Sequence, residues 1–139
     1  MRQMLQVMKA RLLAGEDLVM VTVTATSGAT PRGAGARMLV GKCGRICGTI
    51  GGGAVEYRSE QIALTVLQEK SSRGHDFTLT RDDVQNLGMI CGGACNVFFH
   101  YLSAGDPDIL ALADEAEARF VRGADAWLVS DLGDGGRLY

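Results

Sequence analysis

Hydrophobic positions follow the period of a helix in some stretches of the chain and that of a strand in others. Residues 1–14 place apolar side chains three or four apart before Gly15, which predicts an amphipathic helix. Residues 18–26, LVMVTVTAT, are almost all apolar or β-branched and predict a buried strand. Two short runs, 37–40 and 45–50, flank Gly41-Lys42-Cys43-Gly44 and predict a β-hairpin.

The second half of the chain continues this alternation. A second helix is expected from the glycines at 51–53 to Lys70, and Asp106-Pro107 supplies an N-cap and an N1 proline for a third helix, to about Arg122. Strands are expected at residues 74–80, 94–102 and 126–132, with a turn at 87–93. The pattern predicts a single α+β (mixed α/β) domain: a mixed sheet with a hairpin, about three helices, and glycine-rich loops at strand ends.

Composition narrows the class of protein. The 139 residues, 47% of them hydrophobic, match one compact domain. Lys and Arg number 14 against 16 Asp and Glu, which argues against a generally basic, nucleic-acid-binding surface. No apolar run reaches the roughly 18 residues of a membrane span, and the N-terminus lacks the apolar region of a secretory signal. We therefore expect a cytoplasmic protein without a membrane partner.

Glycine is in excess, with 19 residues, and it gathers in three loops after predicted strands, at residues 27–35, 48–53 and 88–93. Glycine permits positive φ and close approach of the backbone to a ligand. Each loop taken alone is read as a turn. Three loops that meet at one edge of a sheet would instead favour a ligand site.

Two of these loops have chemistry suited to anions. Gly51, Gly52 and Gly53 join a strand to a helix, whose first N–H groups lack partners and suit a phosphate. The spacing matches neither G-x-G-x-x-G nor a Walker A loop. Glu56 is interpreted either as an acid that compensates the helix dipole or as a ligand contact. Arg32 and Arg37 provide forked donors for a phosphate or a planar heterocycle, or are solvated surface arginines.

The four cysteines form two C-x3-C pairs. Four residues of strand span roughly 13 Å at about 3.3 Å per residue, too far for two thiolates on one zinc ion, so no metal site is expected. Cys91 precedes two glycines in a loop and is the candidate reactive thiol. Cys43, Cys47 and Cys95 are interpreted as small buried hydrophobic residues.

The two histidines, His75 and His100, fall on predicted strands without an acidic or nucleophilic neighbour at motif spacing. Both are interpreted as satisfied structural or surface residues. No catalytic triad or Cys-His pair can be assembled, so no catalytic residue is assigned.

Three segments together resemble a known family. Residues 26–40 (TSGATPRGAGARMLV), 44–56 (GRICGTIGGGAVE) and 87–93 (LGMICGG) are similar, in order and spacing, to the N-terminal domain of the XdhC/CoxI family. Its members are accessory factors for xanthine dehydrogenase and related molybdenum hydroxylases. The resemblance implies a cytoplasmic bacterial chaperone, not an enzyme. Such a protein binds the molybdenum cofactor (molybdopterin) while a cysteine desulfurase installs its terminal sulfur, and then passes it to the apo-hydroxylase.

The resemblance also implies a role for each loop. The cofactor is a pterin dithiolene with a phosphate, which the glycines at 51–53 would take. Arg32 and Arg37 would hold anionic or pterin oxygens, and Cys91 would approach the molybdenum end. The implied binding set is Ser27, Gly28, Arg32, Arg37, Gly51, Gly52, Gly53, Glu56, Cys91, Gly92 and Gly93.

The chain departs from the family pattern in three places. Many relatives have an acidic residue where this chain has Ala94, and some have Cys where it has Ala54. Residues 1–139 also lack the C-terminal Rossmann-like domain that is usual in the family, as in a fragment, a stand-alone subunit or an incomplete chaperone. Two other functions stay open: a thiol-dependent or phosphate-handling transferase that uses Cys91, and a structural half of a two-part complex. An unfinished sheet edge would gain from pairing with a second copy, so a homodimer is a further hypothesis.

Overall fold

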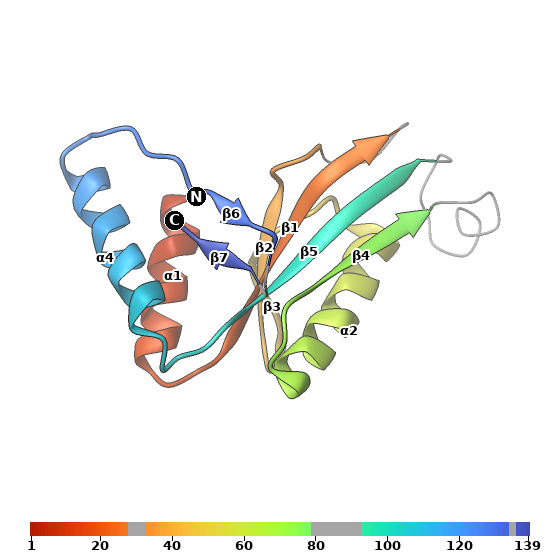
Figure 1. Ribbon diagram of the computed structural model, residues 1–139, viewed down its shortest axis with the longest axis horizontal. Helices are drawn as coiled ribbons and strands as arrows, with labels where there is room; N and C mark the ends of the chain where they lie inside the picture. Colours follow the sequence, from red (N-terminus) through yellow and green to blue (C-terminus); the bar gives the residue numbers. More distant parts are fainter. Residues whose placement is uncertain (28–32, 79–92, 134–135) are drawn as a thin grey trace.

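The computed structural model describes residues 1–27, 33–78, 93–133 and 136–139. Its centre is a five-stranded antiparallel sheet with the strand order β3-β2-β1-β5-β4 (Figure 1). The long strands β1 and β5 lie side by side in the middle, and β3 and β4 form the edges. The strands are β1 (Leu18–Ser27), β2 (Arg37–Gly41), β3 (Gly44–Gly48), β4 (Arg73–Thr78) and β5 (Ala94–Leu102).

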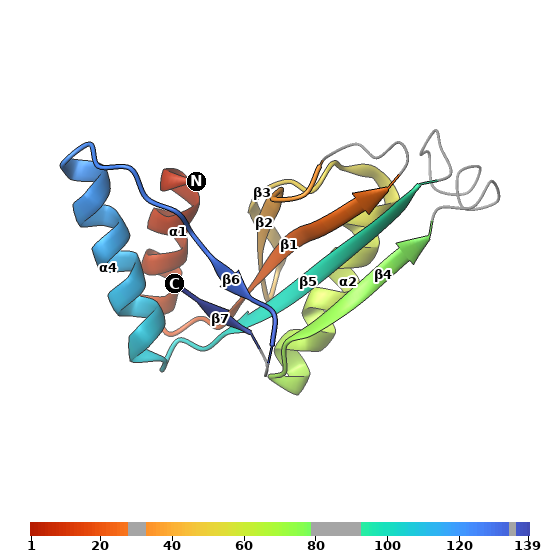
Figure 2. The same cartoon turned by 45° about the horizontal axis from the view of Figure 1, so that its top comes forward.

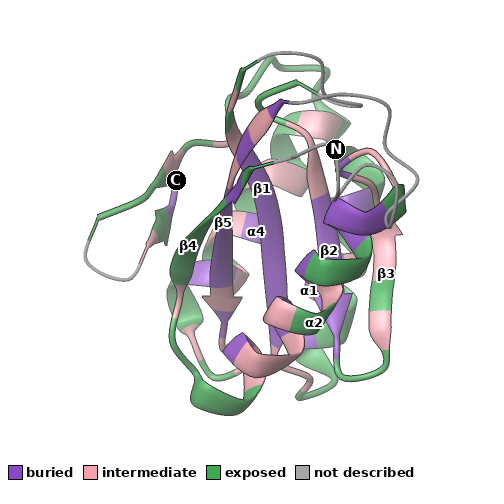
Figure 3. Ribbon diagram, turned by 90° about the vertical axis from the view of Figure 1, so that its right-hand side faces the viewer, coloured by how far each residue is buried: buried purple, intermediate pink, exposed green. Residues whose placement is uncertain are grey.

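Helices cover both faces of the sheet. Helix α2 (Gly53–Glu69) lies on one face, and α1 (Arg2–Leu13) packs with α4 (Pro107–Val121) on the other. Along β1, Val19 and Val21 belong to the core on the α2 side, whereas Leu18 and Met20 belong to the core on the α1 and α4 side. Burial on both faces explains why this strand is a continuous apolar run rather than an alternating one. Figure 3 shows β1 as the buried centre and β4 as an exposed edge.

The predicted α+β class is confirmed, with three helices in the described part of the chain and the β2–β3 hairpin. A mixed sheet was expected from the sequence. Every strand pairing in the described part of the sheet is antiparallel. The N-terminus of α4 also follows the prediction: Asp106 accepts a hydrogen bond from the Asp108 amide at 2.9 Å, and proline stands at the start of the helix.

The strand predicted at 126–132 is wrong in extent. Only Ser130–Asp131 forms a strand, β6, which pairs with β7 (Arg137–Leu138) in a separate two-stranded ribbon. Val129 and Tyr139 extend this ribbon by exchanging two backbone hydrogen bonds of 3.0 Å. The ribbon lies on the sheet face that carries α1 and α4, where Leu128 and Leu138 join the core. Two paired residues per strand leave most of the apolar run AWLV outside regular structure, and Trp127 is 90% exposed.

No helix in the described part of the chain combines the length and apolar character that crossing a membrane requires.

Candidate functional site

The described ends of the three glycine-rich loops meet at one end of the sheet. Ser27, the last residue of β1, pairs with Ala94, the first residue of β5, and Ala94 also pairs with Thr78 at the end of β4. On the other side of β1, Met38 near the start of β2 pairs with Gly48, where β3 ends and leads to α2. Figure 2 shows the ends of β1 and β4 and the start of β5 on the same side. The antiparallel order therefore directs the described ends of the three loops toward the same end of the sheet, with Gly48 level with Val21, six residues before Ser27.

The start of α2 has a backbone that favours glycine at three consecutive positions. The φ angles are +124° at Gly51, +74° at Gly52 and +60° at Gly53. Residues with a side chain rarely adopt these φ angles, so the backbone conformation requires glycine at all three positions. A Cβ atom on Gly52 would meet no heavy atom within 4 Å, so the backbone there faces open space.

Glu56, one turn into α2, turns its carboxylate back toward this loop. Oε2 accepts hydrogen bonds from the Thr49 hydroxyl, from the Ile50 amide at 3.1 Å and from the Gly52 amide at 2.8 Å. Oε1 lies 3.3 Å from Nε of Arg45. Burial alone would raise the pKa of Glu56, but these hydrogen bonds and the arginine hold it below its usual value. This arrangement supports the interpretation of Glu56 as an acid that compensates the helix dipole.

Glu56 and Thr49 also occupy donors that an external anion would otherwise use. The amides of Ile50 and Gly52 point to Glu56, and the Gly51 amide donates to the Thr49 hydroxyl at 3.0 Å. The donors left for a phosphate are those of the first helical turn, beginning at Gly53. Thr49 and Arg45 were missed in the sequence, because a glycine N-cap with an acid four residues later does not match the S/T-x-x-E capping box.

The side chain of Arg37 lies away from this network, although its carbonyl oxygen accepts the Thr49 amide at 3.1 Å. Its half-buried guanidinium donates to the Thr22 hydroxyl at 3.3 Å, to the Leu128 carbonyl oxygen at 3.2 Å and to the Ser130 hydroxyl at 3.2 Å. These partners connect β1 and β2 to the β6–β7 ribbon, on the face opposite α2. Burial lowers the pKa of Arg37, as expected for a guanidinium held among protein groups. Arg37 therefore acts as a clamp: its hydrogen bonds hold the ribbon against β1 and β2.

The other expected binding residues divide into two groups. Ser27 is exposed at the end of β1, and Gly93 is buried directly before β5, so both lie at the same end of the sheet as the start of α2. The remaining four lie outside the described residues: Gly28, Arg32, Cys91 and Gly92.

The three described cysteines have different surroundings. Cys95 is buried in β5, as interpreted from the sequence, and Cys47 is half-buried in β3. Burial raises the pKa of both thiols, which keeps them protonated near neutral pH. Cys43 is exposed, so its interpretation as a buried residue is wrong. It stands in the hairpin turn, where backbone geometry and not packing sets its exposure.

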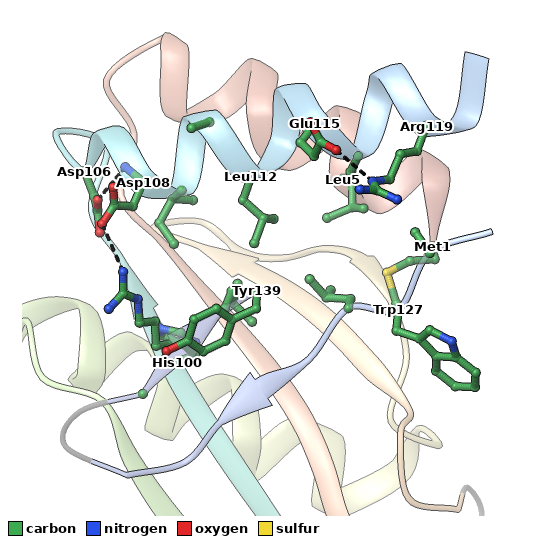
Figure 4. Close-up of a pocket in the computed structure, with 18 of the residues that line it drawn as sticks. Met1, Leu5, His100, Asp106, Asp108, Leu112, Glu115, Arg119, Trp127 and Tyr139 are labelled. Atoms are coloured by element: carbon green, nitrogen blue, oxygen red, sulfur yellow. Dashed lines mark hydrogen bonds and ion pairs between the residues drawn. The ribbon is translucent and has the colours of Figure 1, made fainter. Parts of the chain in front are cut away.

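The two histidines also differ. His75 is exposed on β4, with its ring 4.5 Å from that of Phe77, and is a surface residue as interpreted. His100 in β5 is 5% exposed, and its Nδ1 atom has no hydrogen-bond partner among the described residues. The interpretation of His100 as a satisfied histidine is therefore wrong. Its side chain lines a cavity of about 570 Å³ between α1, α4 and the ribbon, on the face opposite α2 (Figure 4).

Residues 12–94 match the model of the XdhC and CoxI family, and this stretch contains all three segments that carry the resemblance. The chain belongs to the XdhC and CoxI family. Two proteins of Escherichia coli (strain K12) are similar to it. The molybdenum cofactor insertion chaperone PaoD is 31% identical over 111 residues, covering 78% of this chain and 33% of PaoD. The uncharacterized protein YqeB is 40% identical over 79 residues, covering 57% of this chain and 14% of YqeB. This chain thus spans a third or less of either relative.

A solved structure has the same fold. The crystal structure of a xanthine dehydrogenase from Bacillus halodurans superimposes with a TM-score of 0.75 at 24% sequence identity. The match covers 99% of this chain and 40% of that chain. The shared fold therefore extends beyond residue 94 to α4 and the ribbon.

Proposed function

We propose that this domain binds the molybdenum cofactor and takes part in its insertion into a molybdenum hydroxylase, as an accessory chaperone and not as a catalyst. The observation that carries the proposal is the meeting of the three loop ends at one end of the sheet, in a chain of the XdhC and CoxI family. The likeness to PaoD, a molybdenum cofactor insertion chaperone, supports the same role.

The start of α2 fits the anionic part of such a cofactor. The cofactor supplies a phosphate and a pterin, which need N–H donors and an open approach to the backbone. The space over Gly52 is open, and the amides of the first helical turn form the positive end of the helix dipole. Glu56 would not repel the phosphate strongly, because Arg45 and three hydrogen-bond donors balance its charge. In this proposal Glu56 shapes the loop while the amides from Gly53 onward bind the anion.

The two remaining loops would hold the rest of the cofactor. Ser27 and Gly93 border the site, Arg32 would bind anionic or pterin oxygens, and Cys91 would approach the molybdenum end. Arg37 is left out of this binding set, because its guanidinium is engaged by Thr22 and by the ribbon.

The partners in this proposal are an apo molybdenum hydroxylase of the xanthine dehydrogenase type, which receives the cofactor, and a cysteine desulfurase, which supplies its sulfur. We also propose that the domain acts in the cytoplasm and that it can form a homodimer. In this scheme residues 1–139 act as the N-terminal, cofactor-binding unit.

An anaerobic titration tests the proposal. Cofactor released from a purified molybdenum enzyme is added to the protein, and the bound fraction is measured after rapid gel filtration. We expect saturable binding, and at least about a tenfold loss of affinity in the double variant Cys91→Ala, Arg32→Ala, which corresponds to about 1.4 kcal/mol. The matched control is Cys43→Ala, Arg122→Ala, in which both residues are exposed and lie outside the three loops. No saturable binding, or an equal loss in the control, would contradict the proposal.

A further inference from the structure

The cavity beside His100 is separate from the glycine-rich loops. Its walls come from α4, from the N-terminal part of α1 and from the ribbon, and it lies on the sheet face opposite α2. The volume of about 570 Å³ falls within the range of small-molecule sites. Figure 4 shows Leu112 above the cavity, Tyr139 beside His100, and Trp127 with Met1 at the other side.

The floor of the cavity is built around His100. Gly136 of the ribbon packs directly on it: a Cβ atom there would lie 2.8 Å from the Phe98 ring and 3.5 Å from Cδ2 of His100. Only a glycine, here with φ of +84°, permits this approach. The imidazole is thereby enclosed, and its Nδ1 atom has no hydrogen-bond partner among the described residues, which is unfavourable for a buried polar group.

The charges around the cavity favour one class of ligand. Both arginines are already paired: Arg119 lies 2.8 Å from Glu115, and Arg137 lies 3.7 Å from Asp108. Asp106 adds a carboxylate, and its Oδ1 atom accepts the Asp108 amide. The described lining residues therefore carry three carboxylates against two guanidiniums, an excess of one negative charge.

His100 and Asp106 add hydrogen-bond acceptors to this end of the cavity, beside the N–H donors of Arg137. Burial keeps the pKa of His100 low, and a neutral imidazole has one nitrogen that accepts a hydrogen bond. The Asp106 carboxylate is also an acceptor. A bound molecule with N–H donors would satisfy these acceptors, and the excess of negative charge among the lining side chains disfavours an anion such as a phosphate or a carboxylate.

We propose that this cavity binds a small planar aromatic molecule, neutral or cationic, with an amino or ring N–H group directed to His100 and Asp106. Its rings lie between Leu112 and Tyr139, which supply apolar and aromatic surface, with Trp127 at the rim of the cavity. The site differs in charge and in place from the anion site at α2, so the two bind different ligands independently.

The chain provides its own reporters for a test by NMR. It has a single tryptophan, at the cavity, and two histidines, of which exposed His75 serves as an internal control. The ¹⁵N-labelled protein is titrated with 1-naphthylmethylamine, a cationic probe, and with 1-naphthylacetate, an anionic probe with the same rings. We expect saturable shifts of the Trp127 indole N–H and the His100 ring, a static His75 ring, and at least about tenfold tighter binding of the amine.

Two substitutions in α4 test whether the NMR shifts come from binding in the cavity. Ala116→Phe fills it, whereas Ala118→Phe places the same side chain at an exposed position of α4 outside the lining. We expect the first to abolish amine binding and the second to leave it unchanged. His100→Phe keeps a ring without nitrogen atoms and should weaken amine binding about tenfold, which provides a second test if Ala116→Phe does not fold.

Any one of the following results would overturn the inference. These are no saturable shift with the amine, equal affinity for the two probes, or unchanged binding in Ala116→Phe. The Trp127 signal could also shift with protein concentration in the absence of a probe, and not do so in Ala116→Phe. That result would assign this face to a second copy of the chain and would overturn the inference.

Discussion

Replacing Glu56 tests whether its carboxylate fixes the conformation of the glycine loop at residues 51–53, at the start of α2. In Glu56→Ala the amides of Ile50 and Gly52 and the Thr49 hydroxyl lose their acceptor, and Arg45 loses its ion-pair partner. The three glycines at 51–53 would then be free to leave their positive-φ conformations.

The expected loss of stability follows from the burial of these groups. Glu56 is 8% exposed, so water replaces the lost hydrogen bonds only in part. A buried donor without a partner costs about 1–3 kcal/mol, and the effects of neighbours do not add fully. We therefore expect Glu56→Ala to lower the free energy of unfolding by about 2–4 kcal/mol. Glu56→Gln keeps an acceptor oxygen but loses the charge, and should cost about 1–2 kcal/mol.

The pH dependence has a defined sign. The pKa of Glu56 is lower in the folded protein than its ordinary value of 4.5. Its contribution to stability is therefore present above that value and is lost as the pH falls through the folded pKa. Glu56→Gln should lack this contribution, so the stability difference between wild type and variant should shrink below about pH 4.5.

Urea unfolding followed by circular dichroism measures these free energies. Glu69→Ala is the control, because Glu69 forms an exposed pair with Arg73 at 3.3 Å and should contribute less than about 1 kcal/mol. A Glu56→Ala effect below about 0.5 kcal/mol, or no larger than that of the control, would refute the reasoning. So would an equal wild-type and Glu56→Gln difference at pH 7 and pH 3.

Three further predictions concern the rest of the fold. Arg37→Ala removes the contacts to Leu128 and Ser130, so hydrogen exchange at the amides of Val129 and Tyr139 should become at least about tenfold faster; unchanged exchange would contradict the clamp. Gly48→Ala should cost about 3 kcal/mol in urea unfolding, since a methyl group there overlaps the Arg37 carbonyl oxygen and Met4 Cε. Gly52→Ala meets open space but a φ and ψ of +74° and −166° that only glycine adopts readily, so it should cost about 1–3 kcal/mol; a loss larger than that of Gly48→Ala would contradict the overlap argument. Asp17→Asn weakens the acceptor for the Tyr101 hydroxyl at 2.6 Å and the Ala104 amide at 2.8 Å. It should cost about 1–2 kcal/mol at pH 7 and less below the ordinary Asp pKa of 3.8, because that pKa is lowered in the fold; a loss independent of pH would refute this.

The features that the sequence predicts well are those set by local chemistry. The apolar run of β1 and the Asp106-Pro107 start of α4 each depend on neighbouring residues, and both are confirmed. The meeting of the glycine loops at one end was predicted only as a condition, because it depends on the antiparallel strand order.

The features that the sequence did not reveal depend on partners far away in the chain. Arg37 contacts a ribbon more than 90 residues later, and His100 loses its access to water because Gly136 packs on it. The exposure of Cys43 follows from its place in a turn, whose surroundings no period of apolar residues describes. The Glu56 network is local, but its identification required knowing that the carboxylate turns back toward Gly52.

The most direct test of the central claim is to locate the bound cofactor. Hydrogen exchange of individual amides is measured with and without anaerobically added molybdenum cofactor. We predict protection at the start of α2, from Gly53 onward, and around Ser27 and Gly93, with no change at Val129 and Tyr139 of the ribbon. Saturable binding with protection confined to the ribbon and the His100 cavity would contradict it, as would binding that leaves the α2 amides unchanged.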